Sequence, residues 1–215
     1  MSYLFIDTET TGVPRNNFKN WDNCYPVQIS YIIFDSNQNE ILTRNYLIKS
    51  IFKSCEESLK IHGITYEERN KKGIDINNVL KAIKEDVEAF NVKNIVSHGV
   101  LFDIGLLFYE SYRNGADVKY LLKDVNIFCT KRSTLYIKEK HLNGTIEENK
   151  INMQNVKGHA HDALYDAYMC SALFYATDDK NKMLVNVNAL LKGIFEHVPI
   201  LKHIKKDNKI NIFLA

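Results

Sequence analysis

Apolar residues in the first part of the chain gather into three short runs that are separated by polar turns. The run at residues 3–6 is wholly apolar and ends at a carboxylate, which predicts a buried central strand. Two further runs, at residues 27–34 and 41–48, flank a polar turn at 36–39. This pattern predicts two antiparallel strands joined as a β-hairpin.

The rest of the chain alternates between helical periodicity and short apolar runs. Thr65 followed by Glu68 fits a capping box at the start of a short helix. Further helices are predicted at 76–90, 101–112, 162–176 and 183–195, and further strands at 94–97 and 125–128. An initial hairpin followed by alternating helices and strands predicts an α/β fold, with a mixed five-stranded sheet flanked by helices.

Composition limits the classes of function. At 215 residues the chain is long enough for one full hydrophobic core, and no Pro/Gly/Ser-rich linker divides it. A formal net charge of +2 is far below that of a nucleic-acid coat protein, so any contact with nucleic acid should be local. No apolar run approaches the ~20 residues that span a bilayer, and the first residues do not resemble a secretory signal. We therefore expect no membrane partner.

Cysteine usage bears on the cellular compartment. Cys24, Cys55, Cys129 and Cys170 lie far apart in the sequence and form no Cys-x-x-Cys pair. This spacing is typical of free thiols rather than of a zinc site or a disulfide framework. We therefore expect an intracellular protein in a reducing compartment, the cytoplasm or the nucleus.

Acidic residues at the ends of apolar segments are the candidates for chemistry. Asp7 and Glu9 are two residues apart on the first predicted strand, so they should point to the same face. Adjacent carboxylates resist ionising unless a cation lies against them. Asp103 should lie in the first turn of the helix after strand 94–97, where the helix dipole stabilises an anion. Taken singly, each acid could equally be a polar residue at the end of a strand or at the start of a helix, without a role in chemistry.

A third acidic segment lies near the end of the chain. Asp166 falls on a predicted helix beside Ala163 and Ala167, small residues that would let this helix approach the sheet closely. His161 precedes Asp166 by five positions, and we expect it just before the helix, with Asp162 as the N-cap. A general base on such a loop can swing toward a water when substrate arrives. Four carboxylates with one imidazole suit Mg²⁺ or Mn²⁺ and the hydrolysis of a phosphate ester.

Together the three segments resemble the DnaQ-like 3′–5′ exonucleases, in the branch with four acidic residues and a histidine (DEDDh) that includes the epsilon-type proofreading domains. That family has Asp-x-Glu, then Asn-x-x-Phe-Asp, then His-x-Ala-x-x-Asp. The first and third motifs are present as Asp7-Thr8-Glu9 and as the segment from His161 to Asp166. In the second motif Gly99 replaces the asparagine, which removes a local hydrogen bond rather than a metal ligand. The resemblance covers residues 2–176.

The resemblance implies an RNase H-like fold and a site for two divalent ions, Mg²⁺ or Mn²⁺. Residues 1–180 would form the exonuclease domain, and residues 181–215 a helical extension that packs on it or contacts a partner. Asp7 would bridge the two ions. Glu9 and Asp166 would hold one of them further, and Asp103 would reach the other.

Roles for other residues follow from the same resemblance. His161 would accept the proton of the attacking water. The backbone at Thr10 and the side chain of His62, in a His-Gly-Ile segment, are candidates to hold the terminal nucleotide. The basic residues Lys131 and Arg132, and a cluster at 202–209, are candidates for phosphate contacts, although lysine side chains more often serve only solvation.

The function implied is removal of nucleoside 5′-monophosphates from the 3′ end of single-stranded or frayed DNA, in proofreading, repair or degradation. A DNA polymerase is a candidate partner. One alternative is an exoribonuclease that trims RNA with the same site, because nothing in the sequence identifies a reader of the 2′-hydroxyl. A second is an inactive exonuclease-like module that binds a polymerase or nucleic acid. The complete set of acids argues against that module, because such residues cost stability when no metal is bound.

Overall fold

The computed structural model describes residues 1–14, 20–117, 121, 124–153, 156, 158–186, 188–190 and 192, and every structural statement below concerns these residues. A mixed sheet with the strand order β3-β2-β1-β4-β5-β6 organises the chain. β1 pairs antiparallel with β2 and parallel with β4. The strands are β1 Ser2–Thr10, β2 Pro26–Phe34, β3 Glu40–Leu47, β4 Val92–Ser97, β5 Asn126–Cys129 and β6 Leu184–Val185. The predicted hairpin of β2 and β3 is confirmed.

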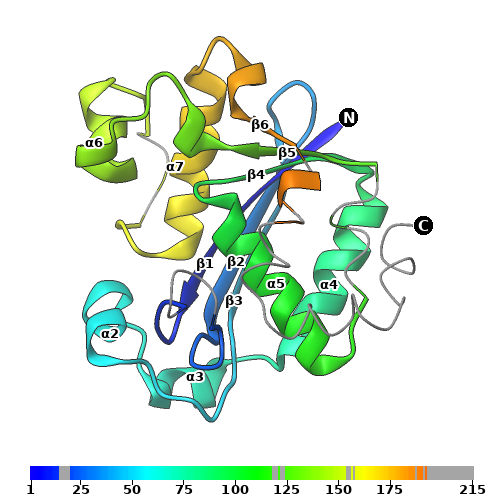
Figure 1. Cartoon of the computed structure of the whole chain (residues 1–215), viewed down its shortest axis with the longest axis vertical. Helices are drawn as coiled ribbons and strands as arrows, with labels where there is room; N and C mark the ends of the chain where they lie inside the picture. The colour runs from blue at the N-terminus through cyan, green and yellow to red at the C-terminus, as the bar shows by residue number, and fades with distance from the viewer. Residues whose placement is uncertain are drawn as a thin grey trace.

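Helices cover both faces of the sheet (Figure 1). α4 (Ile76–Ala89) and α5 (Val100–Asn114) pack on one face, and α7 (Ala163–Ala176) packs on the other. Alternate residues of β1 serve the two layers: Leu4 and Ile6 join the core under α4 and α5, whereas Phe5 packs against α7. This two-sided burial is why the strand reads as a continuous apolar run in the sequence.

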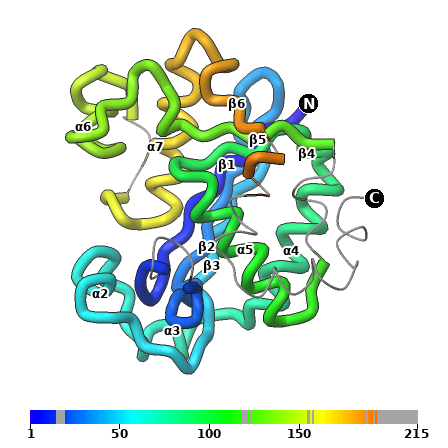
Figure 2. Tube along the Cα trace, viewed as in Figure 1, coloured from blue at the N-terminus to red at the C-terminus, as the bar shows by residue number. Residues whose placement is uncertain are grey.

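Three shorter helices complete the described fold. α2 (Glu56–His62) and α3 (Tyr66–Lys72) lie together at one end of the molecule, and α6 (His141–Glu148) lies beside α7 (Figure 2). The side chain of Thr65 accepts a hydrogen bond from the backbone N–H of Glu68, so the predicted cap of α3 is confirmed. None of the described helices has both the length and the apolar character needed to cross a membrane.

The end of the described chain corrects two predictions. Instead of a helix that begins at residue 183, a 3₁₀ turn at Lys180–Met183 leads into the short strand β6, where Leu184 pairs with Phe128 of β5. The sheet therefore has six strands rather than five. Helical backbone appears at residues 188–190 and 192, and the remainder of the predicted helix and the basic cluster at 202–209 lie outside the described residues. The boundary at residue 180 stays a prediction.

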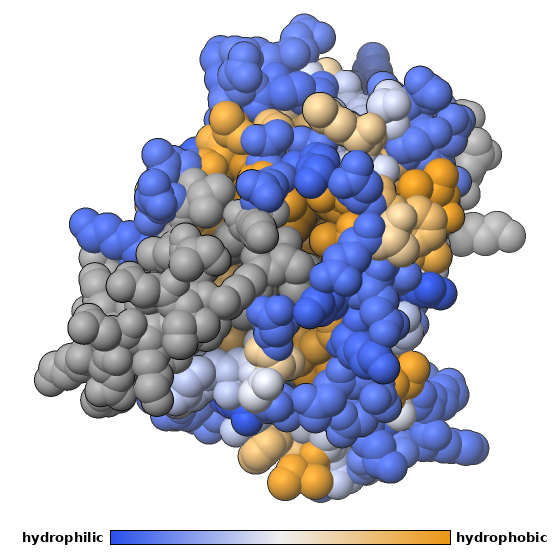
Figure 3. All heavy atoms as spheres, turned by 90° about the vertical axis from the view of Figure 1, so that its right-hand side faces the viewer, coloured by the Kyte–Doolittle hydropathy of each residue, from blue (hydrophilic) through white to orange (hydrophobic). Residues whose placement is uncertain are grey.

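The face of the molecule that carries α4 is mainly hydrophilic in its described part, with scattered apolar side chains (Figure 3). Ion pairs along α4 contribute to this surface, such as Lys81 with Glu85 at 3.7 Å. Exposed pairs of this kind add little stability. The polar residues that are candidates for function lie elsewhere, at the carboxyl end of β1.

Candidate active site

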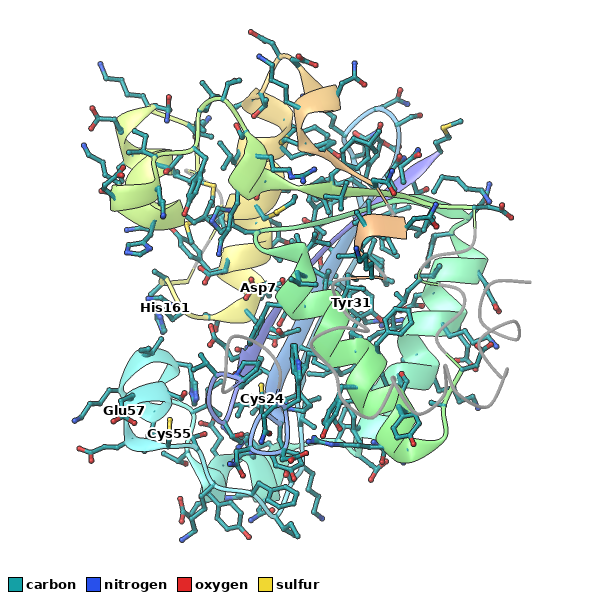
Figure 4. All side chains as sticks on the ribbon, in the orientation of Figure 1. Asp7, Cys24, Tyr31, Cys55, Glu57 and His161 are labelled. Atoms are coloured by element: carbon teal, nitrogen blue, oxygen red, sulfur yellow. The ribbon has the colours of Figure 1, made fainter. Side chains whose placement is uncertain are left out.

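Asp7 and Glu9 project from the carboxyl-terminal half of the central strand. In the antiparallel ladder Asp7 lies opposite Ser30 and Glu9 opposite Gln28, both on β2. Both acids are partly buried and face the same way as Phe5, toward α7. Asp7 lies between α7 and α5, and His161 lies on the loop that leads into α7 (Figure 4). Pairing with β2 continues along this half of the strand, whereas the pairing with β4 ends at Phe5, so the two carboxylates lie where β1 extends past β4.

Asp166 and His161 are held together at the start of α7. The side chain of Asp162 caps this helix by accepting from the N–H groups of Leu164 and Tyr165, as predicted. Asp166 lies in the first helical turn, and its Oδ2 accepts a hydrogen bond of 3.2 Å from the backbone N–H of His161. His161 precedes the helix with a left-handed φ of 67°, and its side chain is exposed. This turn of the backbone places the imidazole of His161 beside the carboxylates of Glu9 and Asp166.

Close packing brings α7 to the sheet. Ala163 and Ala167 are completely buried, which confirms that small residues allow the approach. The backbone N–H of Ala163 also donates to Oε1 of Gln28 on β2, at 3.1 Å. This contact fixes the start of α7 against β2, next to the strand that carries the other acids.

Asp103 reaches the site from the opposite layer. It lies in the first turn of α5, as predicted, and is 2% exposed. Its Oδ1 accepts a hydrogen bond of 2.7 Å from the hydroxyl of Thr8, and its Oδ2 accepts one from the hydroxyl of Ser97. Asp103 is thus anchored between β1 and β4, below the other acids.

The side chains converge on one cleft of about 610 Å³. Asp7, Glu9, His161 and Asp166 all line it, whereas Asp103 is not among its lining residues. Ligand atoms of Glu9, His161 and Asp166 lie within 4.8 Å of one another, close enough to share a metal ion. Residues from β1 and from the start of α7, more than 150 positions apart in the sequence, therefore form a single site.

Burial perturbs all four acids, and repulsion by other carboxylates adds to it for Asp7, Glu9 and Asp166. Burial, followed by the charges of Asp103, Asp166 and Glu9, raises the pKa of Asp7 well above its usual range. Burial and the charge of Asp166 raise the pKa of Glu9 to about 8. Burial is also the main cause that raises the pKa of Asp103 and of Asp166 to about 6. The fully ionised cluster is therefore unfavourable unless a cation neutralises it, and without one the acids retain protons.

One oxygen of the site has no partner within the described chain. Oδ1 of Asp166 is buried and makes no hydrogen bond. A buried carboxylate oxygen without a donor is costly, because it has lost its hydration and gained nothing in return. Together with the raised pKa values, this oxygen makes the carboxylate set suitable for divalent cations, which prefer such ligands.

His62 and Thr10 lie next to the acidic cleft rather than in it. His62 is 5% exposed at the end of α2, and its Nδ1 accepts a hydrogen bond of 3.0 Å from the N–H of Ile64. Burial lowers the pKa of His62, which favours the neutral ring. His62 lines an adjoining pocket of about 590 Å³, together with Asp162. Thr10 ends β1, and its hydroxyl donates to the carbonyl oxygen of Gly12 at 2.8 Å.

The cleft has further lining residues, of which the sequence analysis had named only Lys131, as a candidate phosphate contact. These residues are Lys131, Tyr136, Lys140, His141 and His98. Nδ1 of His98 lies 2.8 Å from the hydroxyl oxygen of Thr130, and burial lowers the pKa of the ring to about 3. Its position directly before the second motif is the signal that would have identified His98.

Comparison with known proteins identifies the family. The sequence model of the exonuclease family RNase_T matches residues 4–174, which is most of the chain. The chain belongs to the DnaQ-like exonuclease family. A search of curated proteins finds no sequence match.

Solved structures share the fold. Exonuclease I of E. coli in complex with a dT13 oligonucleotide matches with a TM-score of 0.64 at 21% identity, over 82% of this chain and 41% of that one. Exonuclease I of Methylocaldum szegediense matches with a TM-score of 0.63 at 20% identity, over 84% and 42%. Exonuclease X in complex with 5′ overhanging duplex DNA matches with a TM-score of 0.58 at 20% identity, over 84% and 96%.

These likenesses establish the RNase H-like exonuclease fold that the sequence implied. The chain spans about two-fifths of the length of the exonuclease I structures that it matches. It spans nearly all of exonuclease X.

Proposed function

We propose that this family member is a metal-dependent 3′–5′ exonuclease that acts on single-stranded or frayed DNA and releases nucleoside 5′-monophosphates. The observation that carries the proposal is the convergence of Asp7, Glu9, Asp166 and His161 on one cleft, with Asp103 anchored beneath them. Carboxylates at this density are stable only beside a cation, and an imidazole beside them supplies a base.

The residues present fit divalent ions. Asp7, Glu9 and Asp166 would hold them, and the unpartnered Oδ1 of Asp166 is the clearest free ligand atom. Both oxygens of Asp103 already accept hydrogen bonds from hydroxyls, so this residue would act through its remaining lone pairs. Bound at these oxygens, Mg²⁺ or Mn²⁺ would stabilise the charge of the phosphate and lower the pKa of a water, and two ions are the expected number.

The chain's own groups supply proton transfer and positioning. His161 is exposed at the rim of the cleft, so its ring can accept the proton of the attacking water. Its backbone N–H meanwhile orients Asp166. The adjoining pocket beside His62, together with the backbone of Thr10, would hold the terminal nucleotide.

DNA is the preferred substrate in this proposal because the similar structures of exonuclease I and exonuclease X are DNA complexes. Cleavage of RNA by the same site is the alternative outcome of the test below. A partner polymerase stays a prediction.

The decisive experiment is a digest of a single DNA strand that carries a label at its 5′ end. With Mg²⁺ or Mn²⁺ we expect a ladder that shortens from the 3′ end, nucleoside 5′-monophosphates as products, and no reaction with chelator. A matched RNA strand reports the sugar preference. Cleavage from the 5′ end, or activity that chelator does not remove, contradicts the proposal.

A pair of variants tests the site itself. Asp7→Ala should abolish nucleotide release while the protein stays folded, because it removes the carboxylate at the centre of the cluster. Glu57→Ala, on the exposed first turn of α2, is the matched control and should keep full activity. Retained activity in the Asp7 variant would mean that the chemistry lies elsewhere.

A further inference from the structure

The one departure from the family's second motif has a structural consequence. Gly99 precedes α5 with a φ of 114°, a backbone conformation that favours glycine. The side chain of Lys131 lies over this glycine: a Cβ at residue 99 would be 3.3 Å from its Nζ and 3.5 Å from its Cε. Any side chain in place of Gly99 would press on the lysine. The glycine therefore leaves room for an ammonium group beside the acids.

Lys131 is placed to interact with a ligand of the cleft. Lys131 lies in the 3₁₀ turn Thr130–Arg132, directly after β5, and its side chain lines the same cleft as Asp7 and Asp166.

Neighbouring basic residues differ from Lys131 in their partners. Lys140 also lines the cleft, but its Nζ forms an ion pair of 2.5 Å with Glu148. Arg132 was a candidate for a phosphate contact together with Lys131, but it donates to the carbonyl oxygen of Leu184 at 2.9 Å and does not line the cleft. We therefore do not place Arg132 among the residues that bind the strand. Within the described part of the chain, Lys131 has neither an ion pair within 4.0 Å nor a hydrogen bond. It is the cleft cation left available to an incoming anion.

We propose that Lys131 binds a phosphodiester oxygen of the nucleic-acid strand in the active cleft, and that Gly99 is the residue that permits it. The inference rests on the proposed function and names a substrate contact for the same site. An ammonium beside carboxylates also competes with divalent ions for the same negative charge. Lys131 therefore strengthens the binding of the strand and weakens the binding of the metal.

These two effects have opposite signs, which a merely structural role would not produce. The test uses the full chain as wild type, Lys131→Met, Lys131→Arg and Arg132→Met. The last variant removes one positive charge at the neighbouring position outside the cleft. Strand binding is measured in a His161→Gln background, so that the DNA survives, by fluorescence anisotropy of a labelled single strand in Mn²⁺ at several salt concentrations.

For Lys131→Met we expect binding about fivefold weaker for every sequence tested, as for the loss of one phosphate contact. The slope of log K against log salt should become shallower by about 0.7, the contribution of one phosphate contact on a single strand. In calorimetry without DNA, the same variant with His161 intact should bind Mn²⁺ more tightly. Lys131→Arg should keep the wild-type slope, and Arg132→Met should change neither quantity.

An unchanged salt slope in Lys131→Met overturns the proposal. An equal change of the salt slope in Arg132→Met also overturns it, because the effect would then reflect only the overall charge of the surface. Weaker Mn²⁺ binding in Lys131→Met also overturns it. These outcomes are distinct from failure of the proposed function. In that case the wild-type protein would degrade no strand at all, whatever residue 131 is.

Discussion

Replacing Glu9 by glutamine should stabilise the protein when no metal is bound. Glu9 is partly buried and lines the same cleft as Asp7 and Asp166, and its pKa is raised from the ordinary 4.5 to about 8. Glutamine keeps the shape of the side chain and removes the charge. The residue therefore opposes folding in the metal-free state, although the proposed function requires it.

The direction of the pH dependence follows from proton binding. Between pH 4.5 and about 8, the folded protein holds a proton on Glu9 that the unfolded chain has released. Stability therefore falls as pH rises through this range, and the full penalty is present above pH 8. A pKa that rises from 4.5 to about 8 corresponds to about 5 kcal/mol as an upper bound. Water and salt around a partly buried carboxylate screen this interaction, so we expect about 2 kcal/mol.

The assay compares urea unfolding of the wild type and Glu9→Gln in chelator at several pH values from 5 to 8.5. The difference between the two proteins reports the charge of Glu9 together with its effect on the pKa of Asp7, because all other titrating groups are common to both. It should be small at pH 5 and reach about 2 kcal/mol in favour of the variant near pH 8.5. Saturating Mg²⁺ should reverse the order, because the wild type gains more binding free energy than the variant does.

Two results would refute this reasoning. One is a Glu9→Gln protein that is less stable than the wild type in chelator at high pH, which would mean that the carboxylate makes favourable contacts. The other is a stability difference that does not change with pH, because the carboxylate would then not be perturbed. Equal stabilisation of both proteins by Mg²⁺ would remove Glu9 from the ligand set.

Three further variants probe other parts of the site and its support. His161→Ala should slow turnover greatly with little change in Mn²⁺ affinity by calorimetry, and loss of Mn²⁺ binding would make the histidine a ligand instead. Thr8→Val removes the 2.7 Å hydrogen bond to Asp103 and should cost about 1–2 kcal/mol by urea unfolding, with lower activity; unchanged values would mean that the hydroxyl does not hold this acid. In Gly105→Ala a Cβ would lie 3.2 Å from the ring of Trp21, so we expect a loss of about 1–2 kcal/mol with normal activity per folded molecule, and no loss would show that the core repacks easily.

The sequence predicted most of the fold because its periodicities are strong. The hairpin, α4, α5 and α7 were predicted to within a few residues of their observed bounds. The apolar run of β1 ends at residue 6 and its second half is polar, but Asp7 and Glu9 were predicted to lie on the same strand, and the structure agrees. That half is a strand nonetheless, since β2 pairs with it along its whole length and the polar side chains occupy the active cleft.

The elements missed have weak local signals. α2 has an unusual N-cap, the thiol of Cys55, and its apolar residues Leu59 and Ile61 are exposed. α6 is held mainly by Leu142 and Ile146, which pack against α7, a contact that no local pattern reveals. β6 is only two residues long and exists because β5 offers a free edge. In each case tertiary packing, not intrinsic propensity, decides the structure.

The active-site acids were predictable because their chemistry constrains their neighbours. The basic residues were less so: the sequence named Lys131 only as one of several candidate phosphate contacts and assigned no role to Lys140 or His141. Each acid has a local requirement visible in the sequence, such as the alanines beside Asp166. Lys131 has no such requirement. A lysine two residues after a strand is unremarkable until the fold brings it over Gly99. Residues that are defined only by what they face across a cleft become apparent in three dimensions.

The position of Asp103 explains why the cluster tolerates so much charge. Hydroxyls of Thr8 and Ser97 donate to it and lower its pKa, in opposition to burial, so this acid is ionised more readily than Glu9. Both donors lie on the central strands β1 and β4, which cannot move without breaking the sheet. The remaining carboxylates then share protons at neutral pH until a cation displaces them. An arrangement of this kind releases protons as metal binds, so metal affinity should rise with pH.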